Sequence, residues 1–150
     1  MADHVRRQIR EAVTTLLTGL PTTGSRVFAS RLYPLQEADL PALRIYTDAE
    51  ETSALTLDHP VIEENSLDVI IEGVAKATAA LDDSLDGIDK EVRGILGAAL
   101  TPAQLGGAQA FNRTGAEIEF ADEGQQPIGM IRMQYRATYI ITANTPDIAH

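Results

Sequence analysis

Cysteine is absent from this 150-residue chain, which excludes disulfide scaffolds, thiolate metal sites and cysteine nucleophiles. No apolar run approaches the ~20 residues that span a bilayer, so the sequence predicts no transmembrane helix and no membrane partner. Basic residues are also few, because 12 Lys and Arg stand against 22 Asp and Glu, for a net charge of −10. This balance argues against a general nucleic-acid binder, whose affinity comes from Lys and Arg on phosphates.

The remaining composition is that of one ordinary globular domain. Hydrophobic residues make up 44% and charged residues 23% of the chain. A domain of this length buries enough surface to fold without a metal or a disulfide. The first residues, Met1 to Arg7, lead into an amphipathic segment that keeps its charges and lacks the apolar centre of a signal peptide. We therefore expect the protein to stay in a cytoplasm after synthesis, or to leave it by a route other than secretion.

Charge is distributed unevenly along the sequence. Residues 1–36 carry a net charge of +3, residues 37–91 carry −12, and residues 92–150 carry −1. A molecule with a basic end and an acidic middle can dock copies of itself head to tail. The alternative is that this segregation disappears when the chain folds.

Two segments have the periodicity of amphipathic helices. Over residues 4–20, apolar side chains recur at spacings of three and four, and Gly19 and Pro21 mark the end. Residues 76–98 show the same spacing more cleanly. We predict a helix over each range.

Other segments alternate apolar and polar residues as strands do. The predicted strands cover residues 27–35, 42–47, 67–73, 116–120 and 128–142, with a turn at 122–127. Residues 48–65 are rich in Asp and Glu and have few apolar anchors, so we expect a long acidic hairpin or loop. Residues 143–150 are expected to form a loose tail. Helices and strands do not alternate as in βαβ units, which predicts a single α+β domain with a mostly antiparallel sheet and two main helices packed on one face.

Motifs of catalysis and metal binding are weak. Residues 82–87 place Asp, Ser, Asp and Gly where a calcium loop begins, but Arg93 stands where the bidentate Glu is required. The three histidines lack ligand spacing, and the chain has no Gly-x-Ser-x-Gly elbow. The acidic pairs Glu63-Glu64 and Glu117/Glu119 are more typical of exposed surface than of acid–base chemistry. We predict no catalytic residues, no metal and no cofactor.

The long strand over 128–142 has two different faces. Tyr135 and Tyr139 alternate with polar residues and are predicted to lie in the core. The polar face carries Arg132, Gln134 and Arg136, which predicts a wet sheet face. Such a face can line a channel when copies of the chain close into a ring.

The order and spacing of these features resemble a known family. The segments that carry the resemblance are residues 4–10 (HVRRQIR), 26–35 (RVFASRLYPL), 40–46 (LPALRIY), 81–86 (LDDSLD) and the closing strand from Pro127 to Tyr139. Together they resemble the tail terminator proteins of long-tailed bacteriophages, the family of minor tail protein U, over nearly the whole chain. No single motif is diagnostic, and the family offers no catalytic residues to carry over.

The resemblance implies a structural virion protein. In such a family the subunit forms a hexameric ring that caps the tail tube, stops its polymerisation and joins the tail to the head–tail connector. The implied location is the neck end of the virion tail, after assembly in the host cytoplasm. The implied partners are other copies of the chain, the tail tube protein and the connector proteins, while DNA passes through without specific binding. Six copies would carry roughly −60, which suits a passage that does not hold phosphates.

One hypothesis for the contacts between subunits, or with the tube, pairs opposite charges. It concerns Arg6, Arg7 and Arg10 in the N-terminal helix and Glu50, Glu51, Glu63 and Glu64 in the acidic segment. Two other readings stay open. The chain could be another head–tail or tail-tube subunit, or a small ligand-binding domain without catalysis.

Overall fold

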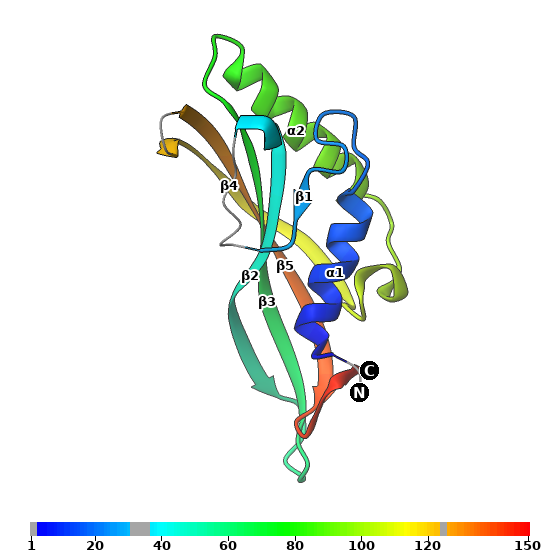
Figure 1. Ribbon diagram of the computed structural model, residues 1–150. Coiled ribbons are helices and arrows are strands. Elements are labelled where there is room, and N and C mark those ends of the chain that lie inside the picture. Colours follow the sequence, from blue (N-terminus) through cyan, green and yellow to red (C-terminus); the bar gives the residue numbers. More distant parts are fainter. Residues whose placement is uncertain (1–2, 31–36, 124–125) are drawn as a thin grey trace.

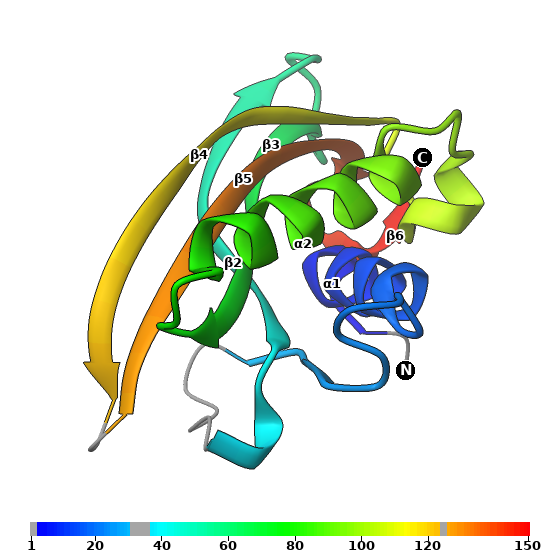
Figure 2. The same cartoon turned by 90° about the horizontal axis from the view of Figure 1, so that it is seen from above.

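The computed structural model describes residues 3–30, 37–123 and 126–150. Two helices, α1 (Val5–Leu17) and α2 (Leu81–Leu96), lie on the same face of a six-stranded sheet (Figure 1). Seen from above, the sheet curves around the two helices (Figure 2). The α+β class, the mostly antiparallel sheet and the single domain are confirmed.

The strands are unequal in length. They are β1 (Val27–Phe28), β2 (Ala42–Ala54), β3 (Ile62–Lys76), β4 (Ala110–Glu123), β5 (Gln126–Thr142) and β6 (Thr145–Ala149). Their order across the sheet is β1-β2-β3-β5-β4, with β6 paired to β5, and every pair is antiparallel except β1 with β2. Two 3-10 helices, η1 (Glu37–Asp39) and η2 (Pro102–Leu105), lie in the connections. The long strands β3 and β5 therefore form the centre, and β4 and the β1/β2 pair form the edges.

Both helices are shorter than the sequence predicts. α1 ends at Leu17 because Thr18 is extended and Gly19 has a φ of +94°. α2 starts only at Leu81, because β3 runs on to Lys76 and the Ala77 N–H donates to the Pro127 carbonyl at 3.1 Å. The apolar stripes themselves are confirmed. The buried positions are Val5, Ile9, Val13 and Leu17 in α1, and Leu81, Leu85, Ile88, Val92 and Leu96 in α2.

The core lies between the helices and the alternate strand residues that face them. Tyr135 and Tyr139 are 3% and 0% exposed, which confirms their place in the core. The ring of Tyr135 stacks on Phe111, with 5.2 Å between the ring centroids. Because neighbouring strands keep the same alternation, the helix-facing side forms the main core, while the other side carries polar and charged residues together with a small buried cluster of Val74, Ile128 and Met130.

Two glycines let α2 approach the sheet closely. A Cβ built on Gly73 of β3 would lie 2.7 Å from Ile88 Cγ2 and 3.1 Å from Ile131 Cγ2. A Cβ on Gly129 of β5 would lie 2.5 Å from a methyl carbon of Leu81. The absence of a side chain at these positions therefore sets the distance between helix and sheet.

The acidic segment 48–65 is the far half of a hairpin formed by β2 and β3. β2 continues to Ala54, β3 begins at Ile62, and the turn covers residues 55–61. A bulge between Thr47 and Glu50 interrupts the ladder. The ranges predicted for these two strands, 42–47 and 67–73, are therefore too short. The far half of the hairpin extends beyond the helices (Figure 1), so its residues lack the apolar alternation by which a strand is recognised in sequence.

The prediction for the C-terminus is wrong. Residues 143–150 are not a loose tail, since Thr145–Ala149 forms β6 against β5. The Gln8 side-chain amide donates to the Asp147 carbonyl at 2.9 Å, and that of Gln109 donates to the His150 carbonyl at 2.8 Å. These bonds come from residues distant in sequence, so no local pattern announces them. They hold the end of the chain beside the start of α1 (Figure 1).

Two further strand predictions need correction. The strand predicted over 116–120 is β4 and starts six residues earlier, at Ala110. The strand predicted over 27–35 is reduced to the two residues of β1, and residues 31–36 of that prediction lie outside the described residues. β1 lies at the end of the sheet order and is therefore an edge strand.

Candidate functional site

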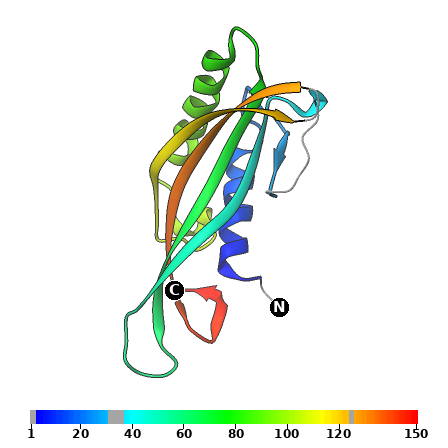
Figure 3. The same ribbon diagram turned by 90° about the vertical axis from the view of Figure 1, so that its left-hand side faces the viewer.

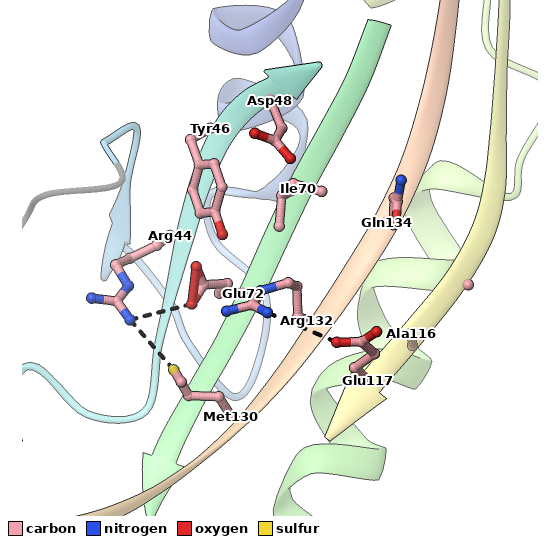
Figure 4. Close-up of a pocket in the computed structure, with 11 residues that line it drawn as sticks. Arg44, Tyr46, Asp48, Ile70, Glu72, Ala116, Glu117, Met130, Arg132 and Gln134 are labelled. Atoms are coloured by element: carbon pink, nitrogen blue, oxygen red, sulfur yellow. Dashed lines mark hydrogen bonds and ion pairs between the residues drawn. The ribbon is translucent and has the colours of Figure 1, made fainter. Parts of the chain in front are cut away.

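The sheet face opposite the helices holds a shallow concavity of about 770 Å³ (Figure 4). Side chains from β2, β3, β5 and β4 line it. They are Arg44, Tyr46, Asp48, Ile70, Glu72, Gly115, Ala116, Glu117, Met130, Arg132 and Gln134. Most of these residues are polar or charged, which is unusual for a surface that is partly enclosed.

A buried ion pair lies at the floor of the concavity. Arg44 and Glu72 are 8% and 5% exposed, and Arg44 Nη2 lies 3.3 Å from Glu72 Oε2. The two residues stand directly opposite each other on β2 and β3, so the ladder register itself brings them together. Met130 Sδ lies 3.4 Å from the same Arg44 nitrogen (Figure 4). Such a pair is costly to disrupt one partner at a time, because the remaining charge stays buried.

Tyr46 and Arg132 extend this network across the face. Burial raises the pKa of Tyr46, a hydrogen bond to Glu72 raises it further, and the charge of Arg132 lowers it. Arg132 Nη1 lies 3.3 Å from Glu119 Oε1 and 3.9 Å from Glu117 Oε2 on β4. The network thus runs from β2 to the β4 edge. It ties four strands together through side chains on the face that carries no helix.

The three residues predicted for a wet sheet face all lie on this side of β5. Arg132 and Gln134 line the concavity. Arg136 lies beyond it, with 49% of its side chain exposed, and its Nε lies 3.5 Å from Asp68 Oδ1. Whether this face lines a channel stays a prediction.

The basic residues of α1 have different surroundings within the chain. Arg7 pairs along its own helix, with Asp3 at 3.3 Å and Glu11 at 2.8 Å. Arg6 Nη2 lies 3.4 Å from the His4 ring, whose other nitrogen caps the helix by accepting from the Arg6 backbone N–H. Arg10 is half-buried on the same helix.

The four acidic residues of the hairpin divide between its two sides. The register places Glu50 and Glu63 on the helix-facing side, and Glu51 and Glu64 on the helix-free side. Glu50 accepts a hydrogen bond from the Tyr139 hydroxyl. Burial raises the pKa of Tyr139, Glu50 raises it further, and the charge of Arg6 lowers it. One chain therefore brings Arg6 near Glu50, while contacts of these residues between subunits stay a prediction.

Several polar contacts escape sequence reasoning altogether. They include Arg44 with Glu72, Tyr139 with Glu50, and Arg113 of β4 with Asp89 of α2. Each joins residues that are at least 24 positions apart. The sequence does show a charged residue on each of the two predicted strands that hold Arg44 and Glu72. This signal identifies the pair only when the register of the two strands is known.

The described residues contain no cluster of three or more His, Asp or Glu side chains arranged to hold a metal ion. The calcium-loop candidate, residues 82–87, lies within α2. None of the helices in this part of the chain is long and apolar enough to cross a bilayer.

Comparison with known proteins gives a likeness of fold. No family model matches the chain, and no curated protein matches it. The chain is similar to a chain of a solved structure described as "Virion of native gene transfer agent (GTA) particle". The TM-score is 0.50 and the sequence identity is 16%, and the match covers 92% of this chain and 92% of the other.

Proposed function

We propose that this chain is a structural protein of a phage-type virion, and within the virion its tail terminator. The observation that carries the proposal is the likeness in fold to a chain of a gene transfer agent virion, which spans 92% of both chains. A match over nearly the full length of each chain relates whole domains and leaves little of either outside the comparison. The order of sequence features, which resembles the tail terminator family, supports the finer assignment.

A terminator of this kind works by shape and surface charge. Six copies form a ring on the growing end of the tail tube, occupy the surface that the next tube subunit would bind, and present a new surface to the head–tail connector. The net charge of −10 per chain suits a ring through which DNA passes without being held. The ion-paired sheet face suits the same task, because its Arg side chains are already engaged by carboxylates.

Gene deletion tests the proposal directly. In the strain that produces the particle, removal of the gene is expected to give tails longer than normal that lack heads, because nothing closes the growing tube. A plasmid copy of the gene is the control and restores normal tail length. Tails of normal length with heads attached in the deletion strain would contradict the proposal.

Electron microscopy separates the terminator from a tail-tube subunit. Purified protein added to deletion-strain tails is expected to form a ring at one end of each tube. Tubes assembled from the protein alone would instead identify a tube subunit, which is the main alternative. A thermal-shift screen with metals and nucleotides tests the ligand-binding alternative, and we expect no shift.

A further inference from the structure

The two long edges of the sheet have different chemical characters. β4 is the last strand of the sheet order, and in the described part of the chain β1 covers β2 only at Leu43 and Arg44 (Figure 3). An uncovered edge presents N–H and C=O groups that another strand can pair with. The outer edge of β4 and the 49–54 portion of β2 are therefore both candidates for pairing between chains.

The β4 edge carries two large exposed apolar side chains, and among the described strands only β6, with Ile148, exposes another. Ile118 is 53% exposed and Phe120 is 71% exposed. Their partners on β5 are Ile131 and Gly129, which places both on the side of the sheet that faces the helices. Exposed aromatic and branched aliphatic side chains next to an open strand edge mark a surface that is covered by another protein.

The surroundings of this apolar edge are acidic. Asp89 of α2 forms an ion pair with Arg113 of β4, so this flank of α2 faces β4. Asp86 and Asp82 lie three and seven positions earlier, on the same flank, and both are exposed. Glu117 and Glu119 lie on the other side of β4, where Arg132 pairs with both. The edge thus combines an apolar patch with a negative rim.

The helix-facing side of the β2 edge holds Glu50 and lies beside the basic flank of α1. Arg6 is exposed on this flank, in the first turn of α1. Arg10 lies one helical turn further along the same flank. α1 contacts both β1 and β2. A strand that joins the β2 edge therefore meets the basic flank of α1.

We propose that the β4 edge of one copy joins the β2 edge of the next copy, so that the sheet continues from chain to chain. The occupant of each edge is thus a second copy of this chain, and the inference deepens the proposed function, on which it rests. Ile118 and Phe120 then lie on the helix-facing side of the joined sheet, beside the first turns of the neighbour's α1, and Asp82 and Asp86 face its Arg6 and Arg10. This pairing gives the α1 arginines a partner other than the acidic hairpin, whose contact with them between subunits stays a separate prediction. A contact between two different edges repeats, and it closes into a ring when its rotation permits.

Cross-linking tests the pairing, since the natural chain has no cysteine. Ala54→Cys marks the β2 edge and Ile118→Cys marks the β4 edge, and both positions are exposed on the helix-facing side. With a short bis-maleimide, a mixture of the two variants is expected to give dimers, while neither variant gives dimers alone. The double variant gives a ladder of larger species. Dimers of Ile118→Cys alone, or no dimers in the mixture, would overturn the proposal.

The cross-linking is carried out both on purified protein and on isolated particles, so that it can fail separately from the proposed function. Termination in the deletion assay without the cross-link between edges leaves the function standing and rejects this interface. If the cross-link forms but deletion of the gene leaves tails normal, the interface is supported and the proposed function is rejected. The wild-type chain, treated in parallel, is the control for reaction at lysines.

Charge exchange tests the electrostatic part of the contact. Arg10→Glu is expected to weaken association about tenfold, because the acidic rim then meets a carboxylate. Asp86→Lys in the same chain is expected to restore it, since the two edges then attract again with reversed signs. Arg136→Glu, an equal change of charge on the helix-free face of β5, is the matched control and leaves association unchanged. Equal weakening by both glutamate variants would contradict the assigned faces.

Discussion

At the scale of single residues, the helix-free face depends on charges that are paired inside the chain. Arg44 and Glu72 are almost fully buried, and each lies in the middle of a long strand. Burial of an ion pair contributes little net stability against an apolar pair of the same size, but loss of one partner is expensive. The pair therefore favours one register of β2 against β3.

The first prediction follows from this asymmetry. Glu72→Gln is expected to lower the free energy of unfolding by about 3 kcal/mol, because the buried guanidinium of Arg44 then loses the charge of the buried carboxylate opposite it. Urea unfolding measures the change. Asp68→Asn removes the more exposed contact with Arg136 and is the control, with a loss below about 1 kcal/mol. Equal losses in the two variants would show that burial does not distinguish the pairs.

The second prediction concerns alkaline pH. Burial raises the pKa of Tyr46, Tyr135 and Tyr139 above the ordinary value of 10.0. The folded protein thus keeps phenolic protons that the unfolded chain releases, so the free energy of unfolding falls as pH rises above 10.0. Tyr139→Phe is expected to reduce the slope of this fall. Unfolding curves between pH 9 and pH 12 measure it, and an unchanged slope would contradict the assignment.

At the scale of elements, predictability follows from whether an element touches the core. α1, α2 and β5 each have one buried and one wet face, so their apolar periodicity predicts them to within a few residues. The outer half of the β2–β3 hairpin has no helix over it, and its acidic residues therefore look like a loop. β6 is held by backbone pairing and by the amide of Gln8, neither of which leaves a pattern in its own sequence.

The third prediction uses the close approach of α2 to the sheet. Gly73→Ala is expected to destabilise the protein by about 1–3 kcal/mol, because the new methyl group meets Ile88 and Ile131 on opposite sides. Gly87→Ala introduces the same group on α2, where no atom lies within 4 Å, and is expected to stabilise the helix by about 1 kcal/mol. Thermal unfolding of both variants checks the opposite signs. A gain in Gly73→Ala would show that α2 shifts freely on the sheet.

At the scale of the whole molecule, the sequence predicts the fold class but not how its charges meet. The basic residues of α1 and the acidic residues after position 37 stand out in sequence by sign alone. In the folded chain Arg7 pairs with Asp3 and Glu11, and Glu50 accepts a hydrogen bond from the Tyr139 hydroxyl. A separate group of acidic residues lies around β4. Sequence reasoning identified Arg132, Gln134 and Arg136 as one face because strand alternation is local. It missed the pairing of Arg44 with Glu72 because the register between two strands is not a local property of either strand.

The fourth prediction concerns the end of the hairpin. Leu57 is 98% exposed in the turn, and Leu55 beside it is 51% exposed. Replacement of residues 56–61 by Asn-Gly, a sequence suited to a two-residue turn, is expected to change the free energy of unfolding by less than about 0.5 kcal/mol. Because the apolar tip projects past the core, we expect the shortened protein to lose binding to tails. Co-sedimentation with deletion-strain tails measures this, and undiminished binding would exclude the tip as a contact.

The clasp between Gln8 and the β6 backbone has a practical consequence for labelling. Because the Gln8 side-chain amide donates to the Asp147 carbonyl, the first turns of α1 and the C-terminal strand lie side by side. A pair of dyes, one in the first turns of α1 and one on β6, would therefore start with high energy transfer and lose it early if β6 peels away, giving an optical report on the C-terminal strand alone.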